Sequence, residues 1–200
     1  MHIWILGSSI PFWAGQQAAT TSGGKNLNLP AKVHWFGLRG MQWHQLDPTI
    51  MDLLKRKAPP NYLMIHLGSN DLTKPEITSK KLVEEIKCSL LRYNALLSNT
   101  TLVWSSILPR LYWHGVPVEM GKKINKKRTK VNRRVRSFIL DLGGAVISHD
   151  NITPSDIPLF RYDGTHLSRE ANSIYLHNIQ SAFHMFLNGE KYYSAQPNTN

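Results

Sequence analysis

Short apolar runs alternate with longer amphipathic segments along this chain, and that alternation limits the folds it can adopt. Five runs rich in β-branched and aromatic residues have the length and composition of buried strands. They are Ile3–Leu6, Val33–Phe36, Tyr62–Leu67, Thr101–Trp104 and Ala145–Ile147. Because helices that connect successive strands form right-handed crossovers, the pattern predicts a parallel sheet with helices on both faces, an α/β fold.

The segments between these runs carry signals for helix starts. Asp47 followed by Pro48 predicts an N-cap and a proline at the first helical position. Thr78 or Ser79 is placed to cap a later helix, and Ser168 to cap the last one. The helices therefore fall between the predicted strands, as the α/β pattern requires.

The composition is that of one globular domain. The chain has 200 residues, of which 42% are hydrophobic and 10% aromatic, enough to build a sizeable core. We expect the domain to span residues 1–190 and residues 191–200 to form a flexible polar tail.

The sequence has no feature that directs it into or across a membrane. Its longest apolar runs are far shorter than the roughly 20 residues that span a bilayer, and its start lacks the basic and apolar regions of a signal peptide. Cys88 is the only cysteine, so no internal disulfide forms. These features predict an intracellular protein.

Residues able to do chemistry follow several of the predicted strands. The segments are Gly7–Ile10, Gly37–Gly40, Gly68–Asp71 and, past a loop after the fifth strand, Asp163–His166. In open parallel sheets, ligands bind beyond the carboxyl ends of the strands. We therefore expect these four segments to meet at one edge of the sheet.

The residue types in these segments are those that acyl transfer needs. Ser9 is a candidate nucleophile, His166 a base able to take its proton, and Asp163 a carboxylate able to orient the imidazole. The backbone N–H groups of Ser9 and Gly40 and the side-chain amide of Asn70 are candidate donors to the oxyanion. Each alone is an ordinary loop residue; the four segments together predict an active site.

The same segments resemble the conserved blocks of the SGNH (GDSL-like) hydrolase family. Gly7–Ile10 resembles the first block, usually Gly-Asp-Ser-Leu, and Gly40 the glycine of the second. Leu67–Asp71 is similar to the third block and Asp163–His166 to the Asp-x-x-His of the last. The likeness runs from residue 3 to about residue 187, and esterase domains of some vertebrate retroelement proteins are similar.

This resemblance implies a flavodoxin-like, three-layer α/β/α fold with a five-stranded parallel sheet. It also implies a serine esterase that hydrolyses small carboxylic esters, with short-chain acyl or acetyl groups, through an acyl-enzyme and without metal or cofactor. The catalytic residues would be Ser9, Asp163 and His166, and the oxyanion would be bound by Ser9, Gly40 and Asn70.

The first block departs from the family pattern, because Ser8 stands where the family has aspartate. The departure puts the local hydrogen bonding and the efficiency of the site in question. It also makes Ser8 a rival nucleophile, although register with the family pattern selects Ser9.

Two tryptophans close to these segments, Trp13 and Trp43, are either walls of an acyl pocket or ordinary core residues. His66 lies inside a predicted strand and is interpreted as structural.

The positive charge is concentrated in one segment. Nine basic residues and no acidic ones lie between Lys122 and Arg136, out of a formal net charge of +11. The simplest interpretation is the solvated face of a helix. The alternative is a catalytically weak or inactive module of the same fold that binds nucleic acid or an anionic surface through this segment.

Overall fold

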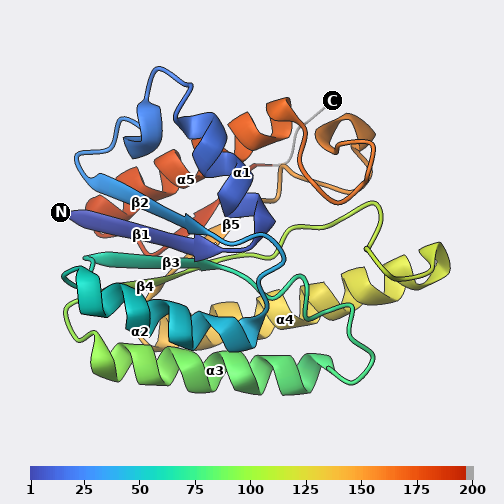
Figure 1. The fold of residues 1–200 in the computed structure, drawn as a ribbon, viewed down its shortest axis with the longest axis horizontal. Helices are drawn as coiled ribbons and strands as arrows, with labels where there is room; N and C mark the ends of the chain where they lie inside the picture. The colour runs from blue at the N-terminus through green and yellow to red at the C-terminus, as the bar shows by residue number, and fades with distance from the viewer. Residues whose placement is uncertain (197–200) are drawn as a thin grey trace.

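A computed structural model, which describes residues 1–196, contains one six-stranded sheet in which every pair of neighbouring strands is parallel (Figure 1). The strand order is β2-β1-β3-β4-β5-β6. The strands are β1 (His2–Gly7), β2 (Lys32–Gly37), β3 (Tyr62–His66), β4 (Thr101–Ser105), β5 (Ala145–Ser148) and β6 (Tyr192–Ser194). The first five occupy the order 2-1-3-4-5 of flavodoxin-like proteins.

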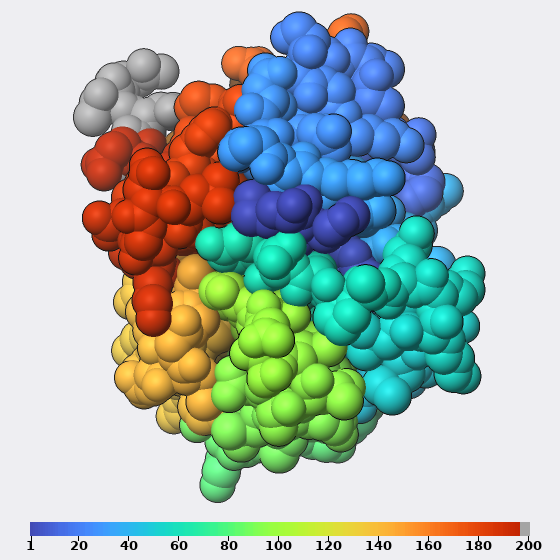
Figure 2. All heavy atoms as spheres, turned by 90° about the vertical axis from the view of Figure 1, so that its left-hand side faces the viewer, coloured from blue at the N-terminus to red at the C-terminus, as the bar shows by residue number. Residues whose placement is uncertain are grey.

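Helices cover both faces of the sheet. On one face lie α1 (Ser9–Ala18) and α5 (Arg169–Leu187), and on the other α2 (Leu46–Arg56), α3 (Ser79–Leu96) and α4 (Gly121–Asp141) (Figure 1). Figure 2, viewed from the end where the strands begin, shows α5 on one side of the strand ends and α3 and α4 on the other. The predicted three-layer α/β/α fold is confirmed. Four short 3₁₀ turns complete it: η1 (Gly24–Asn26), η2 (Trp43–Gln45), η3 (Val118–Met120) and η4 (Ile157–Leu159).

The sheet has one strand more than the five that were predicted, because residues 192–194 form β6. This strand pairs with β5, with Tyr192 opposite Val146, so this part of the segment 191–200 is not a free tail. Its aromatic side chains hold it: Tyr193 packs on the cluster beneath α5, and the Arg136 guanidinium lies 5.8 Å from the Tyr192 ring. Residues 197–200 lie outside the described residues.

The predicted helix caps hold for two helices and fail for one. The hydroxyls of Thr78 and Ser168 accept hydrogen bonds from backbone N–H groups at the starts of α3 and α5. Asp47, however, is not an N-cap, because the turn η2 runs directly into α2, which begins at Leu46. Its carboxylate instead accepts a hydrogen bond from Tyr93 and pairs with Arg92 of α3.

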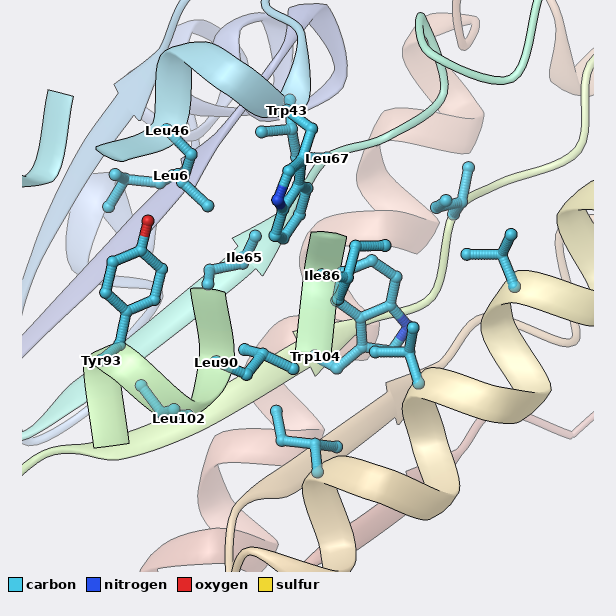
Figure 3. Packing of buried hydrophobic residues seen from close by; sticks show 14 of the residues in the cluster. Leu6, Trp43, Leu46, Ile65, Leu67, Ile86, Leu90, Tyr93, Leu102 and Trp104 are labelled. Atoms are coloured by element: carbon cyan, nitrogen blue, oxygen red, sulfur yellow. The ribbon is translucent and has the colours of Figure 1, made fainter. Parts of the chain in front are cut away.

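Alternate residues of the central strands fill two separate cores. On β1, Ile3 and Ile5 face α1 and α5, while Trp4 and Leu6 face α2, α3 and α4. This second core also contains Trp104 and Tyr93, with which Leu6 is seen in Figure 3. A strand that is apolar on both sides reads as a continuous hydrophobic run, which is why the sequence pattern located it. Within residues 1–196, no helix is long and apolar enough to cross a membrane.

Two glycines let the first turn of α1 lie directly against the ends of β1 and β2. A Cβ atom on Gly37 would lie 2.3 Å from the backbone nitrogen of Phe12, and one on Gly7 would lie 2.8 Å from the ring carbon Cγ of Pro11, as well as 2.2 Å from the carbonyl oxygen of His66 on the neighbouring strand β3. Real Cβ atoms do not approach backbone so closely, so any larger residue must push the elements apart. This contact fixes where the residue at the start of α1, Ser9, is placed.

Gly37→Ala is expected to lower the free energy of unfolding by about 1–3 kcal/mol, because its methyl group overlaps the α1 backbone. Denaturant unfolding measures the change. Gly121→Ala is the matched control, because at the start of α4 the added Cβ has its nearest neighbour 3.8 Å away. Alanine also favours helix there, so the control should be neutral or stabilising. Equal stability of the two variants would contradict the close contact.

Candidate active site

The order of the strands creates a natural binding position at the carboxyl ends of β1 and β3. The chain leaves β1 toward β2 on one side and returns through β3 on the other, so the connections at these two strand ends diverge. Such a switch point leaves a crevice in which α/β proteins bind ligands. Ser9 follows β1 directly, and Asn70 follows β3 after a short turn.

Asp163 and His166 form a hydrogen-bonded pair. The distance between His166 Nδ1 and Asp163 Oδ2 is 2.7 Å, and Asp163 Oδ1 accepts hydrogen bonds of 2.9 Å from the backbone N–H groups of Thr165 and His166. The turn is anchored by the carbonyl of Gly164, which accepts hydrogen bonds from Leu111 and Tyr112. A carboxylate bonded to Nδ1 leaves Nε2 as the ring nitrogen that can receive a proton.

The surroundings of Asp163 favour its charged form. Partial burial alone would raise the pKa of Asp163, but hydrogen bonds from His166 and Thr165 outweigh it and hold the pKa below its ordinary value. The carboxylate is therefore ionised at neutral pH. It can keep the proton of the imidazole on Nδ1 and stabilise the imidazolium that forms when Nε2 accepts a second proton.

Ser9 is the first residue of α1 and has a small exposed area, whereas the preceding residue, Ser8, has none. Ser9 is 6% exposed, and its N–H belongs to the first turn, where helical N–H groups lack intrahelical partners. Ser8 is 0% exposed, and its hydroxyl is buried without a hydrogen-bond partner in the described chain. The Ser8 hydroxyl is therefore closed to a substrate in this conformation.

Neighbours of the predicted site residues meet around one small cavity of about 10 Å³. Its walls include Ile10 beside Ser9, Ser69 beside Asn70, and Thr165 beside His166. Three of the four segments that the sequence singled out are thus brought together here, while Gly37–Gly40 contributes no residue to the walls of this cavity. Within residues 1–196, no hydrogen bond joins the Ser9 hydroxyl to the His166 imidazole. Such catalytic contacts are often long in unliganded sites and tighten when substrate binds.

The loops that carry the two other predicted oxyanion donors, Asn70 and Gly40, are joined by a hydrogen bond. Asn70 Nδ2 donates a 2.9 Å hydrogen bond to the carbonyl of Met41, the residue that follows Gly40. The second N–H of that amide stays available. Gly40 has a φ of 75°, a left-handed conformation in which glycine is unstrained, and it is exposed.

Arg110 is a buried residue of the site that the sequence reasoning missed. It is 5% exposed, and its guanidinium donates to the Ser69 hydroxyl at 2.9 Å and to Asn70 Oδ1 at 3.4 Å. Burial lowers the pKa of Arg110 to about 10, against the opposing effect of the Asp163 charge, so it stays protonated at neutral pH. Arg110 lies in the loop after β4, outside every motif that the sequence analysis used, and only the fold brings it beside Asn70.

Asp71 holds the loop that carries Gly40. Both carboxylate oxygens lie 3.1 Å from the backbone nitrogen of Trp43, so Asp71 accepts its hydrogen bond. Burial raises the pKa of Asp71, although the Trp43 N–H and nearby basic side chains oppose the shift. Trp43 itself is a core residue rather than a pocket wall, since it packs beside Trp104 and bonds to Ser89 (Figure 3).

Trp13, the other tryptophan near the site, lies between two arginines. The Arg39 guanidinium is 5.5 Å and the Arg161 guanidinium 4.6 Å from its ring centre. The face of an indole ring attracts such cations. This contact joins the loop after β2, helix α1 and the segment before Asp163.

A buried chain of hydrogen bonds lies behind the site. Ser105 Oγ is 2.9 Å from His66 Nδ1 and 2.8 Å from His149 Nε2, and Asn178 bonds to the other nitrogen of His149. His66 is thus a hydrogen-bonded structural residue, as predicted. Burial lowers the pKa of His66 to about 3 and that of His149 well below its ordinary value, so both rings are neutral at pH 7.

These buried rings predict a loss of stability in acid. Because the pKa of His66 falls from 6.5 to about 3 on folding, the unfolded chain binds an extra proton between these pH values. Stability should therefore decrease as the pH falls from about 6.5 toward 3. In His66→Gln this dependence should be shallower, measured as melting temperature against pH. His177→Gln, at an exposed position of α5, is the control; equal slopes in the two variants would contradict the buried neutral ring.

Within the described residues, no group of three or more His, Cys, Asp or Glu side chains is arranged to hold a metal ion.

Several solved structures have the same fold. A lipolytic protein of the G-D-S-L family from Veillonella parvula is 11% identical, with a TM-score of 0.72 over 92% of this chain and 98% of that one. A GDSL-like lipase from Bacteroides thetaiotaomicron is 15% identical, with a TM-score of 0.73 over 92% and 88%. An acetylxylan esterase from Geobacillus stearothermophilus is 11% identical, with a TM-score of 0.62 over 90% and 93%. No protein-family model and no curated protein matches the sequence.

Proposed function

We propose that this protein is a serine esterase of the SGNH type that hydrolyses small carboxylic esters. The main support is the Asp163–His166 pair, whose turn contributes walls to the same small cavity as the residues next to Ser9 and Asn70. The fold is one that lipolytic G-D-S-L proteins and acetylxylan esterases use. Fold alone does not define activity, so the proposal rests on the site.

In the proposed mechanism, Ser9 Oγ attacks the ester carbonyl while His166 Nε2 takes its proton. Asp163 stabilises the imidazolium, and the N–H groups of Ser9, Gly40 and Asn70 bind the oxyanion. The imidazolium then gives its proton to the leaving alcohol as the carbon–oxygen bond breaks. The same imidazole then takes a proton from water, which attacks the acyl-enzyme. As the bond between the acyl group and Ser9 breaks, the imidazolium gives this proton to Ser9 Oγ.

The small volume beside the site supports a short acyl group. The cavity holds about 10 Å³, and Ile10, Leu108 and Leu167 supply its apolar walls. A space of about 10 Å³ holds at most about one water molecule, so the walls must move outward for any acyl group. An acetyl group needs the least movement, whereas a long acyl chain needs an extended apolar channel. We therefore infer that acetyl and other short-chain esters are preferred.

Ser9→Ala is expected to lower kcat for a chromogenic acetate ester by about three orders of magnitude or more, because the nucleophile is lost. Ser8→Ala is the matched control, as the neighbouring hydroxyl is buried and outside the proposed mechanism. Melting temperatures of both variants confirm folding. Wild-type turnover by Ser9→Ala, or loss of activity only in Ser8→Ala, would rule out the assignment.

Arg110 is proposed as a positioning residue that holds Asn70 through its amide oxygen. Arg110→Gln should lower kcat about 10- to 100-fold while KM changes little, because the oxyanion develops only in the transition state. Arg110→Lys should recover part of the loss, since it keeps a cationic donor. A change confined to KM, or to thermal stability, would contradict this role.

Helix α4 supports a second candidate function, binding of nucleic acid. Six of its basic residues are exposed: Lys122, Lys123, Lys126, Lys130, Arg133 and Arg134. Such a surface attracts polyphosphates by releasing counterions. Reversing the charge at Lys126, Lys130 and Arg134 should abolish salt-sensitive binding of single-stranded RNA, measured by fluorescence anisotropy. Binding unchanged by these substitutions would exclude α4 as the interface.

A further inference from the structure

A cavity of about 360 Å³ lies beyond the ends of β4 and β5, between α4 and the loops that follow the two strands. We call it the arginine cavity; its walls include Arg128, Asn132, Arg133 and Arg136 of α4, Leu108 after β4, and Asp150 after β5. None of the proposed catalytic residues lines it. Its volume falls within the range of about 300–1,000 Å³ that small-molecule sites occupy.

The spacing of residues on α4 explains how one helix can serve both the core and this cavity. Val131, Val135 and Ile139 are spaced by four residues and are buried on the sheet. Arg128, Asn132 and Arg136 have the same spacing three residues earlier, so they form a neighbouring stripe on the helix. That stripe lines the arginine cavity.

The cavity has an excess of positive charge. Three arginines line it, and Asp150 is the one acid among its lining residues. His149 also lines it, but burial keeps the pKa of this histidine well below its ordinary value, so it adds no charge at pH 7. The net lining charge is therefore about +2, which a single carboxylate or phosphodiester would only half neutralise.

Arg128 has a donor that the protein leaves unused. One of its terminal nitrogens donates a 2.9 Å hydrogen bond to the carbonyl of Ile107, but its Nε is buried and has no partner among the described residues. Burial lowers the pKa of Arg128 to about 10, partly opposed by the charge of Asp150, so it stays protonated at neutral pH. Because the Arg128 side chain also lines the cavity, a small shift of the guanidinium would let an oxyanion there accept a hydrogen bond from this donor.

We propose that the arginine cavity binds a small phosphomonoester, with Arg128, Arg133 and Arg136 contacting its phosphate group. A phosphomonoester carries nearly two negative charges at neutral pH, matching the net charge of the lining, and several acceptor oxygens. Arg136 donates one hydrogen bond of 3.3 Å to the Tyr192 hydroxyl, and its other N–H groups remain for such a ligand. Arginine forms forked hydrogen bonds to such groups. The volume of the cavity leaves space for the organic part of the ligand. The site is separate from the proposed esterase site and does not depend on its activity.

Titration calorimetry of the full chain with inorganic phosphate and methyl phosphate, at constant ionic strength, tests this site. Both probes should bind, and dimethyl phosphate, with one negative charge, should bind more weakly. Arg133→Gln should weaken binding of methyl phosphate about tenfold, because an ionic hydrogen bond is lost. Arg134→Gln is the matched control: it removes the same charge from the next residue of α4, which does not line the cavity.

Arg128→Gln should weaken binding at least as much as Arg133→Gln. Because Arg128 is largely buried, this variant is first checked for an unchanged melting temperature. Ser9→Ala should leave phosphate binding unchanged, which separates this site from the esterase proposal. Absence of binding at millimolar methyl phosphate would overturn the proposal. So would equal weakening by Arg133→Gln and Arg134→Gln, or tighter binding of dimethyl phosphate or an oligonucleotide, since these indicate attraction to the helix as a whole.

Discussion

The close contact between helix α1 and the ends of β1 and β2 determines the geometry of the whole site. Gly37 leaves room for the backbone of Phe12, and Gly7 for the ring of Pro11, at distances that a side chain would prevent. The contact places Ser9 at the edge of the sheet, with its N–H in the unpaired first turn of a helix. Ser8, the residue before the helix, is fully buried, whereas Ser9 keeps a small exposed area.

The charged groups around this edge hold one another in place. Asp163 stays ionised through hydrogen bonds within its own turn and orients His166. Arg110 is buried but remains cationic, and it connects the turn after β3 to the region of Asp163 by contact with Asn70 and by charge. A buried arginine is tolerable when its donors are satisfied, and here they fix the amide proposed to bind the oxyanion.

Two chemically different regions lie at the carboxyl edge of the sheet. Beside β1 and β3 the free space is about 10 Å³, and its walls combine aliphatic side chains with the polar His66, Ser69 and Arg110. Beyond β4 and β5 the arginine cavity is larger and positively charged. Leu108 and Pro109 line both, so they separate the two. A parallel sheet makes this arrangement natural, because every strand delivers a loop to the same edge.

The sequence alone determined the α/β layering, because strands buried on both faces are continuous apolar runs. It also proposed Ser9, Asn70, Asp163 and His166 as site residues, through motifs local in the chain. It did not reveal β6, whose stability comes from pairing with β5. Tertiary structure alone decided that Ser8 is sealed, that Trp43 belongs to the core and that Arg110 supports Asn70. These features depend on contacts between residues distant in sequence, and neither periodicity nor spacing encodes which distant side chains will meet.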